Sequence, residues 1–164
     1  YSIFNVGEYT FAPWKVVWPN MGNRIEASVV SGVDSKPIIP QHIVSLVPLK
    51  CDSEAHYVCA LVNSSPFQFA AFAYSQAGGK SFGTPHILEN IRLPKFTPED
   101  TDHQKLSELS RKAHEICSSN SKDELEAIET AIDHAAARAW GLTDAELAEI
   151  RAGLKELKGA TDAP

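Results

Sequence analysis

The sequence predicts an α+β fold: a small curled, mostly antiparallel sheet with packed helices, followed by a three-helix C-terminal region. Short β-branched and aromatic segments, separated by Gly, Pro and Asn turns, occupy the beginning of the chain, which is typical of a small sheet. Later in the chain, apolar residues recur at helical spacing between capping signals. These two patterns divide the chain into an α+β domain at residues 1–96 and a helical region at residues 97–164.

Four short strands are expected in the first part, at residues 10–18, 25–30, 36–40 and 42–49. The first of them contains Pro13, which indicates an edge strand or a bulge because proline cannot donate to a sheet ladder. Trp14 and Trp18 have the same parity along this strand and therefore point to the same face. We expect at least one of the two indoles in the core.

After these strands, the spacing of apolar residues changes to that of helices. Residues 53–63 fit a helix that Asp52 or Ser53 would cap, and Ser65-Pro66 starts a second helix that runs to Tyr74. A Gly-rich loop follows from Gln76 to Thr84. Residues 87–93 then predict a closing strand that ends at Pro94.

Three helices with clear start and stop signals are expected in the second part. Thr97-Pro98 begins the first, because it places a capping residue before a first-turn proline. Ser121 begins the second and Gly141 ends it, while Thr143 and Glu146 form the capping box of the third.

Charge is distributed unevenly over a chain of 164 residues with a formal net charge of −6. Residues 1–98 carry a net charge of +1, and residues 99–164 carry −7. The overall acidity therefore does not exclude a nucleic-acid partner for the first part. No apolar run approaches the length of a membrane span, so we expect a cytoplasmic protein that does not enter the membrane.

No coherent catalytic or metal-binding set is found. The six His and three Cys show no zinc-ligand spacing, so no metal site is expected. Gly79-Lys80-Ser81 resembles the end of a phosphate-binding loop, but that motif needs a glycine where Tyr74 stands. The chain starts at Tyr1 without an initiator Met, and we expect it to be part of a longer protein.

Four strings carry a resemblance to a known family, in this order: residues 7–18 (GEYTFAPWKVVW), 36–40 (KPIIP), 54–66 (EAHYVCALVNSSP) and 91–96 (IRLPKF). Together they resemble the C-terminal target-recognition domain of adenine-specific DNA methyltransferases from restriction–modification and phage-defence systems. A helix ending in Leu61-Val62-Asn63-Ser64 and the Leu93-Pro94 step are the hallmarks. The tail is also similar, with Asp133 on a helix and Trp140-Gly141-Leu142-Thr143 after it.

The resemblance implies a specificity domain that binds double-stranded DNA and positions the target adenine for base flipping. The family's catalytic Asn-Pro-Pro-aromatic motif does not occur in this sequence. The resemblance therefore places adenine methylation and S-adenosylmethionine in an upstream methyltransferase domain, so that the fragment itself has no cofactor and no activity. It also implies a fused or partnered nuclease domain or subunit.

Candidate DNA-binding residues follow from the groups that such a module needs. The Gly-rich loop and the residues after it offer polar groups for bases and phosphates, namely Gln76, Lys80, Ser81, Thr84 and His86. Lys15, Arg24 and Lys36 stand beside the predicted sheet and its turns. The alternative interpretation of each residue is a solvated surface group.

Two further interpretations stay open. Half of a type I restriction specificity subunit would also end in a proline and a long helix, although it predicts a more continuous coiled coil than three capped helices. A protein-interaction module without DNA contact would use the acidic helices to dock a partner.

Overall fold

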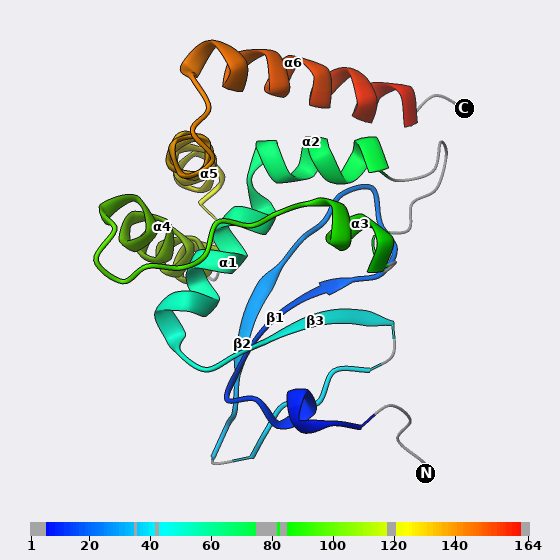
Figure 1. Ribbon diagram of the computed structural model, residues 1–164, viewed down its shortest axis with the longest axis vertical. Coiled ribbons are helices and arrows are strands. Elements are labelled where there is room, and N and C mark those ends of the chain that lie inside the picture. The colour runs from blue at the N-terminus through cyan, green and yellow to red at the C-terminus, as the bar shows by residue number, and fades with distance from the viewer. Residues whose placement is uncertain are drawn as a thin grey trace.

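The computed structural model describes residues 6–34, 36–41, 43–74, 82, 85–117 and 121–161 and, except at residues 85–87 and 158–161, their side chains. The elements in chain order are η1 (Glu8–Phe11), β1 (Trp14–Pro19), β2 (Ser28–Ser31), β3 (Val44–Leu49), α1 (Asp52–Asn63), α2 (Ser65–Tyr74), α3 (Pro85–Asn90), α4 (Thr101–Cys117), α5 (Lys122–Ala139) and α6 (Asp144–Thr161). The predicted α+β class is confirmed, with an antiparallel sheet at one end and helices packed on it (Figure 1).

The sheet has the strand order β2-β1-β3, and both pairings are antiparallel. Val16 stands at the centre of the register, opposite Val29 on β2 and Val47 on β3. Val16 and Trp18 are buried on the face that meets α1, which confirms that one of the two predicted indoles lies in the core. Alternation along β1 thus positions the sheet on the helices.

Two of the expected strands are wrong. Residues 36–40 form no strand, and only Lys36 makes an isolated bridge with Val33. Pro37 and Pro40 have no N–H to give to a ladder. Residues 87–93 are also not a strand, because the chain forms helix α3 from Pro85 and then runs extended without a partner strand.

The helices form two layers over the sheet. In Figure 1, α1 lies directly on the sheet, α4 and α5 lie beside α1, and α2 and α6 run side by side at the far end. The α2–α6 contact is close: a Cβ added at Gly153 would lie 2.9 Å from the ring of Phe69. Core side chains come from both parts of the chain, including Leu61 of α1 and Leu106 of α4. None of the described helices combines the length and apolarity needed to cross a membrane.

The expected ends of the last two helices are confirmed. Thr143 and Glu146 form the capping box: the Thr143 N–H donates to Oε2 of Glu146 over 2.7 Å, and the Glu146 N–H donates to the Thr143 hydroxyl over 3.3 Å. Gly141 has a φ of +70° after α5, a conformation that glycine adopts without strain.

Two expected caps are wrong. Helix α1 is capped by Cys51, whose Sγ accepts a hydrogen bond from the Glu54 N–H over 3.4 Å. Helix α4 begins at Thr101, and the Asp100 carboxylate accepts from the N–H groups of Asp102 and His103 over 2.9 and 3.1 Å. Thr97 and Pro98 instead stand just before this cap.

Candidate functional site

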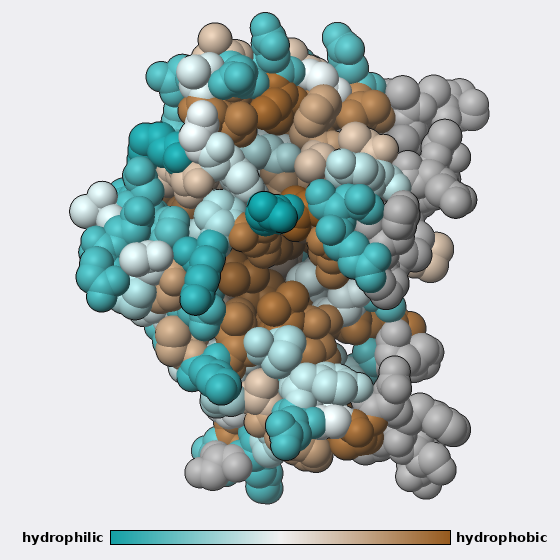
Figure 2. All heavy atoms as spheres, in the orientation of Figure 1, coloured by the Kyte–Doolittle hydropathy of each residue, from teal (hydrophilic) through white to brown (hydrophobic). Residues whose placement is uncertain are grey.

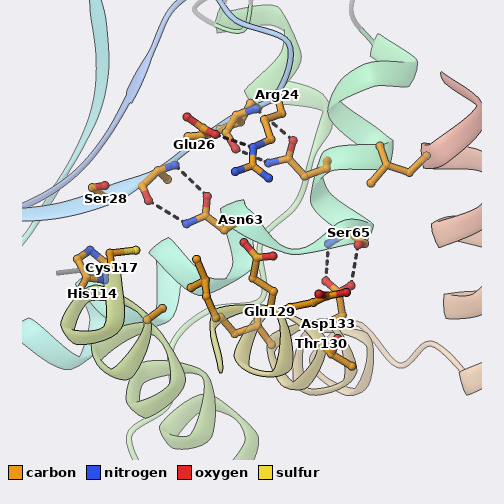
Figure 3. Close-up of a pocket in the computed structure, with 18 of the residues that line it drawn as sticks. Arg24, Glu26, Ser28, Asn63, Ser65, His114, Cys117, Glu129, Thr130 and Asp133 are labelled. Carbon is orange, nitrogen blue, oxygen red and sulfur yellow. Dashed lines mark hydrogen bonds and ion pairs between the residues drawn. The ribbon is translucent and has the colours of Figure 1, made fainter. Parts of the chain in front are cut away.

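Residues 24–28 form a polar wall that two side-chain amides hold against α1 and α2 (Figure 3). Asn63 accepts from the Ala27 N–H and donates to the Ala27 carbonyl, both over 2.8 Å. Gln68 does the same for Ile25, over 3.1 and 2.7 Å. The two side-chain amides thus bind backbone groups that a neighbouring strand would otherwise bind. Asn63 belongs to one of the motifs found in the sequence, whereas Gln68 was not predicted; its one signal is a polar residue within an apolar helix.

Asp133 of α5 ties three helices together. Its carboxylate accepts from the N–H and the hydroxyl of Ser65 at the start of α2, over 2.6 and 2.7 Å. It also accepts from Nε of Arg151 on α6 over 2.9 Å. The Asp133 side chain is only 11% exposed, so these bonds are made largely out of water.

The extended segment 91–97 is held by side chains in place of a strand. The Tyr57 hydroxyl donates to the Pro94 carbonyl over 2.9 Å, and the Trp140 indole N–H donates to the Arg92 carbonyl over 3.1 Å. The Thr97 N–H donates to Nδ1 of His103 over 3.0 Å. Figure 2 shows apolar side chains gathered in a hollow at the centre of this face, beside this segment.

The residues that carried the resemblance therefore belong to one framework. Asn63 and Ser65 end α1 and begin α2, Asp133 bonds to Ser65, and Trp140 holds the segment that contains Pro94. These positions lie far apart in the sequence, and their shared role is to fix the sheet, the polar wall and the helices relative to one another.

Two histidines fill the contact between α1, α4 and β2. His56 lies with Nδ1 3.0 Å from the Ser110 hydroxyl, and its ring stands edge-on to that of His114 at 5.1 Å between centroids. His114 accepts from the Val29 N–H of the edge strand β2 over 3.0 Å. Burial lowers the pKa of His56 to about 4, with smaller lowering effects from the neighbouring His114 and Arg111, and Asp52 opposes this shift.

Acidification is expected to destabilise the protein through His56. Because the pKa of His56 is lower in the folded chain than the ordinary value near 6.5, the unfolded chain binds the proton more readily. The stabilisation is complete above pH 6.5 and is lost as the pH falls toward 4, by about 2–3 kcal/mol in all. Urea unfolding of the unmodified chain and of His56→Gln between pH 7 and pH 4 measures this; an equally steep fall in the variant would contradict it.

The structure separates the three predicted DNA-binding cations next to the sheet. Lys15 is 1% exposed and donates from Nζ to the Ala12 carbonyl over 2.7 Å, which gives it a structural contact. Arg24 is exposed on the polar wall and pairs with Glu26 over 2.6 Å. Lys36 is exposed in the turn after β2.

The Gly-rich loop falls mostly outside the described residues, including Gln76, Lys80, Ser81 and Thr84; His86 lies on α3, with its side chain not described. Phe82 is the one residue of positions 76–84 that the structure describes, and it is buried. Its N–H donates to the Asn20 carbonyl over 2.7 Å, at the end of β1 opposite the Lys36 turn. Phe82 and Lys36 therefore stand at opposite ends of β1, a strand about 20 Å long.

Comparison with known proteins gives one partial relative. Over 65 residues, 40% of this chain, the sequence is 32% identical to the Type II methyltransferase M.NspV of Nostoc sp. (strain ATCC 29411 / PCC 7524). Part of this chain is therefore similar in sequence to a methyltransferase. The matched stretch spans 14% of the length of M.NspV. No family model and no solved structure matches the chain.

Proposed function

We propose that this chain is the target-recognition module of an adenine-specific DNA methyltransferase of a restriction–modification or phage-defence system. The observation that carries the proposal is the partial similarity to a Type II methyltransferase. The framework of Asn63, Ser65 and Asp133 supports it, because reading base edges requires rigidly held side chains.

In this proposal the chain performs no methyl transfer. A catalytic domain outside these residues binds S-adenosylmethionine and receives the flipped adenine, and a nuclease domain or subunit completes the system in the cytoplasm. The module supplies the contacts that hold the duplex and fix the register of the target base.

The proposed DNA contacts come from Lys36 and from the Gly-rich loop. Lys36, exposed in the turn after β2, is proposed to supply a phosphate contact, and Gln76, Lys80, Ser81, Thr84 and His86 are proposed from the sequence as further contacts. Arg24 is left out of the phosphate contacts because Glu26 offsets its charge.

Substitution of Lys36 and Lys80 tests this arrangement. Lys36→Ala and Lys80→Ala are each expected to weaken duplex binding severalfold and to reduce the slope of log affinity against log salt by about 0.9, since each removes one phosphate contact. Fluorescence anisotropy with a labelled duplex measures both values. Lys155→Ala on α6 is the matched control and is expected to change neither. Unchanged slopes for both test variants would remove these residues from the interface.

A further inference from the structure

The polar wall forms one side of an open cleft with a volume of about 630 Å³, within the range of about 300–1,000 Å³ that is usual for ligand sites. The end of α4, the outer face of α5 and part of α6 form the other sides. Its floor is apolar and includes Leu125, Ile132 and Leu154. Figure 3 shows Arg24 and Glu129 pointing into the cavity from opposite walls.

The alternation of side chains along the polar wall determines which of them face the cleft. Ile25 and Ala27 are buried in the core, and the Gln68 and Asn63 amides bind their backbone groups. Because successive side chains of an extended segment point to opposite faces, Arg24, Glu26 and Ser28 line the cleft. The framework thus holds one polar face toward the cavity.

The rim of the cleft has an excess of negative charge. Arg24 pairs with Glu26 over 2.6 Å, and Arg151 pairs with Asp133 over 2.9 Å, so these four charges are balanced. Glu126 and Glu129 also line the cleft, and in the described part of the chain neither has an ion-pair or hydrogen-bond partner. Two unbalanced carboxylates beside the cavity disfavour a phosphate backbone and favour a cationic occupant.

We propose that this cleft docks an extended basic segment of a protein partner, with arginine or lysine at alternate positions. Side chains two residues apart on a strand are about 6.8 Å apart, close to the spacing of Glu126 and Glu129, which are three residues apart on one face of α5. The apolar floor accepts the aliphatic stems of the basic side chains. The remaining N–H groups of Arg24 face the cavity and can donate to backbone carbonyls of the segment.

The test uses the full chain and a fluorescein-labelled peptide Ala-Arg-Ala-Arg-Ala. The peptide is expected to bind, and the double variant Glu126→Gln/Glu129→Gln is expected to bind it about tenfold more weakly. The matched control Glu108→Gln/Glu115→Gln removes two exposed carboxylates of α4 outside the cleft and is expected to leave the affinity unchanged. Thermal melting of both variants verifies that they remain folded.

Three outcomes would overturn the proposal: no peptide binding, an equal loss in both double variants, or equal binding of an Ala-Glu-Ala-Glu-Ala peptide. Displacement of the basic peptide by unlabelled duplex, with the same dependence on Glu126 and Glu129, would assign the cleft to nucleic acid and also overturn it. Duplex binding is measured separately on the same variant. Its absence would count against DNA recognition alone, since the docking cleft does not depend on it.

Discussion

Replacing Asp133 by alanine is expected to lower the free energy of unfolding by about 4 kcal/mol. The change removes the acceptor of the Ser65 N–H and hydroxyl and the partner of Arg151, and deleting one member of a largely buried charge pair costs about 3–5 kcal/mol. Because Ser65 begins α2 and Arg151 lies on α6, the loss separates three helices rather than loosening one side chain. Urea unfolding at pH 7 measures the effect.

Two further variants test whether the Asp133 carboxylate itself causes this loss of stability. Asp133→Asn retains the size of the side chain and one accepting oxygen, so a smaller loss of about 2 kcal/mol is expected. Glu149→Ala removes an exposed carboxylate of α6 and is expected to change stability by less than about 0.5 kcal/mol. A loss below about 1 kcal/mol for Asp133→Ala would mean that the three helices do not depend on this carboxylate.

Removing both side-chain amides that hold the polar wall is also expected to lower the free energy of unfolding substantially. In Asn63→Ala/Gln68→Ala, the N–H groups of Ile25 and Ala27 and the Ile25 carbonyl lose their partners inside the core, and the Ala27 carbonyl keeps only the Cys59 thiol. Each buried group left unsatisfied costs about 1–3 kcal/mol, and partial entry of water reduces the sum to about 4 kcal/mol. Hydrogen exchange at Ile25 and Ala27, together with urea unfolding, measures the local and the global effect.

The two single variants make this prediction sharper. Since Asn63 and Gln68 hold neighbouring residues of one segment, the second substitution is expected to cost less than the first, and the losses are not additive. Gln41→Ala, an amide exposed in a loop, is the matched control with no expected effect. Slow exchange at both amides in the double variant would contradict the proposed role of the side chains.

Local patterns predicted most of the fold. The shared parity of Trp14 and Trp18 along β1 predicted at least one indole in the core, and Gly141 and the Thr143–Glu146 box marked helix ends, because these features depend on neighbours in sequence. Segment 87–93 was predicted as a strand because its apolar residues satisfy either period. The outcome there depends on Tyr57 and Trp140, whose side chains satisfy the backbone of the segment after α3.

The candidate site was less predictable, since it depends on residues far apart in sequence. Arg24 and Glu129 lie 105 positions apart, and the packing of α5 on α4 and α1 brings both to one cleft. Lys15 was predicted from its charge to contact DNA, whereas the sheet buries its stem and directs Nζ to a carbonyl. Asn63 and Asp133 could be identified from the sequence as motif residues. The groups to which their side chains hydrogen-bond could not be predicted from it.

A salt titration of duplex binding by the unmodified chain tests most directly the proposal that this chain binds duplex DNA. With Lys36 and Lys80 as phosphate contacts, the slope of log affinity against log salt is expected to be about −1.8, which is a loss of about twelvefold between 50 and 200 mM salt. Binding at 50 mM salt with a slope near this value would support the claim. No duplex binding at 50 mM salt, or binding that salt does not weaken, would contradict it.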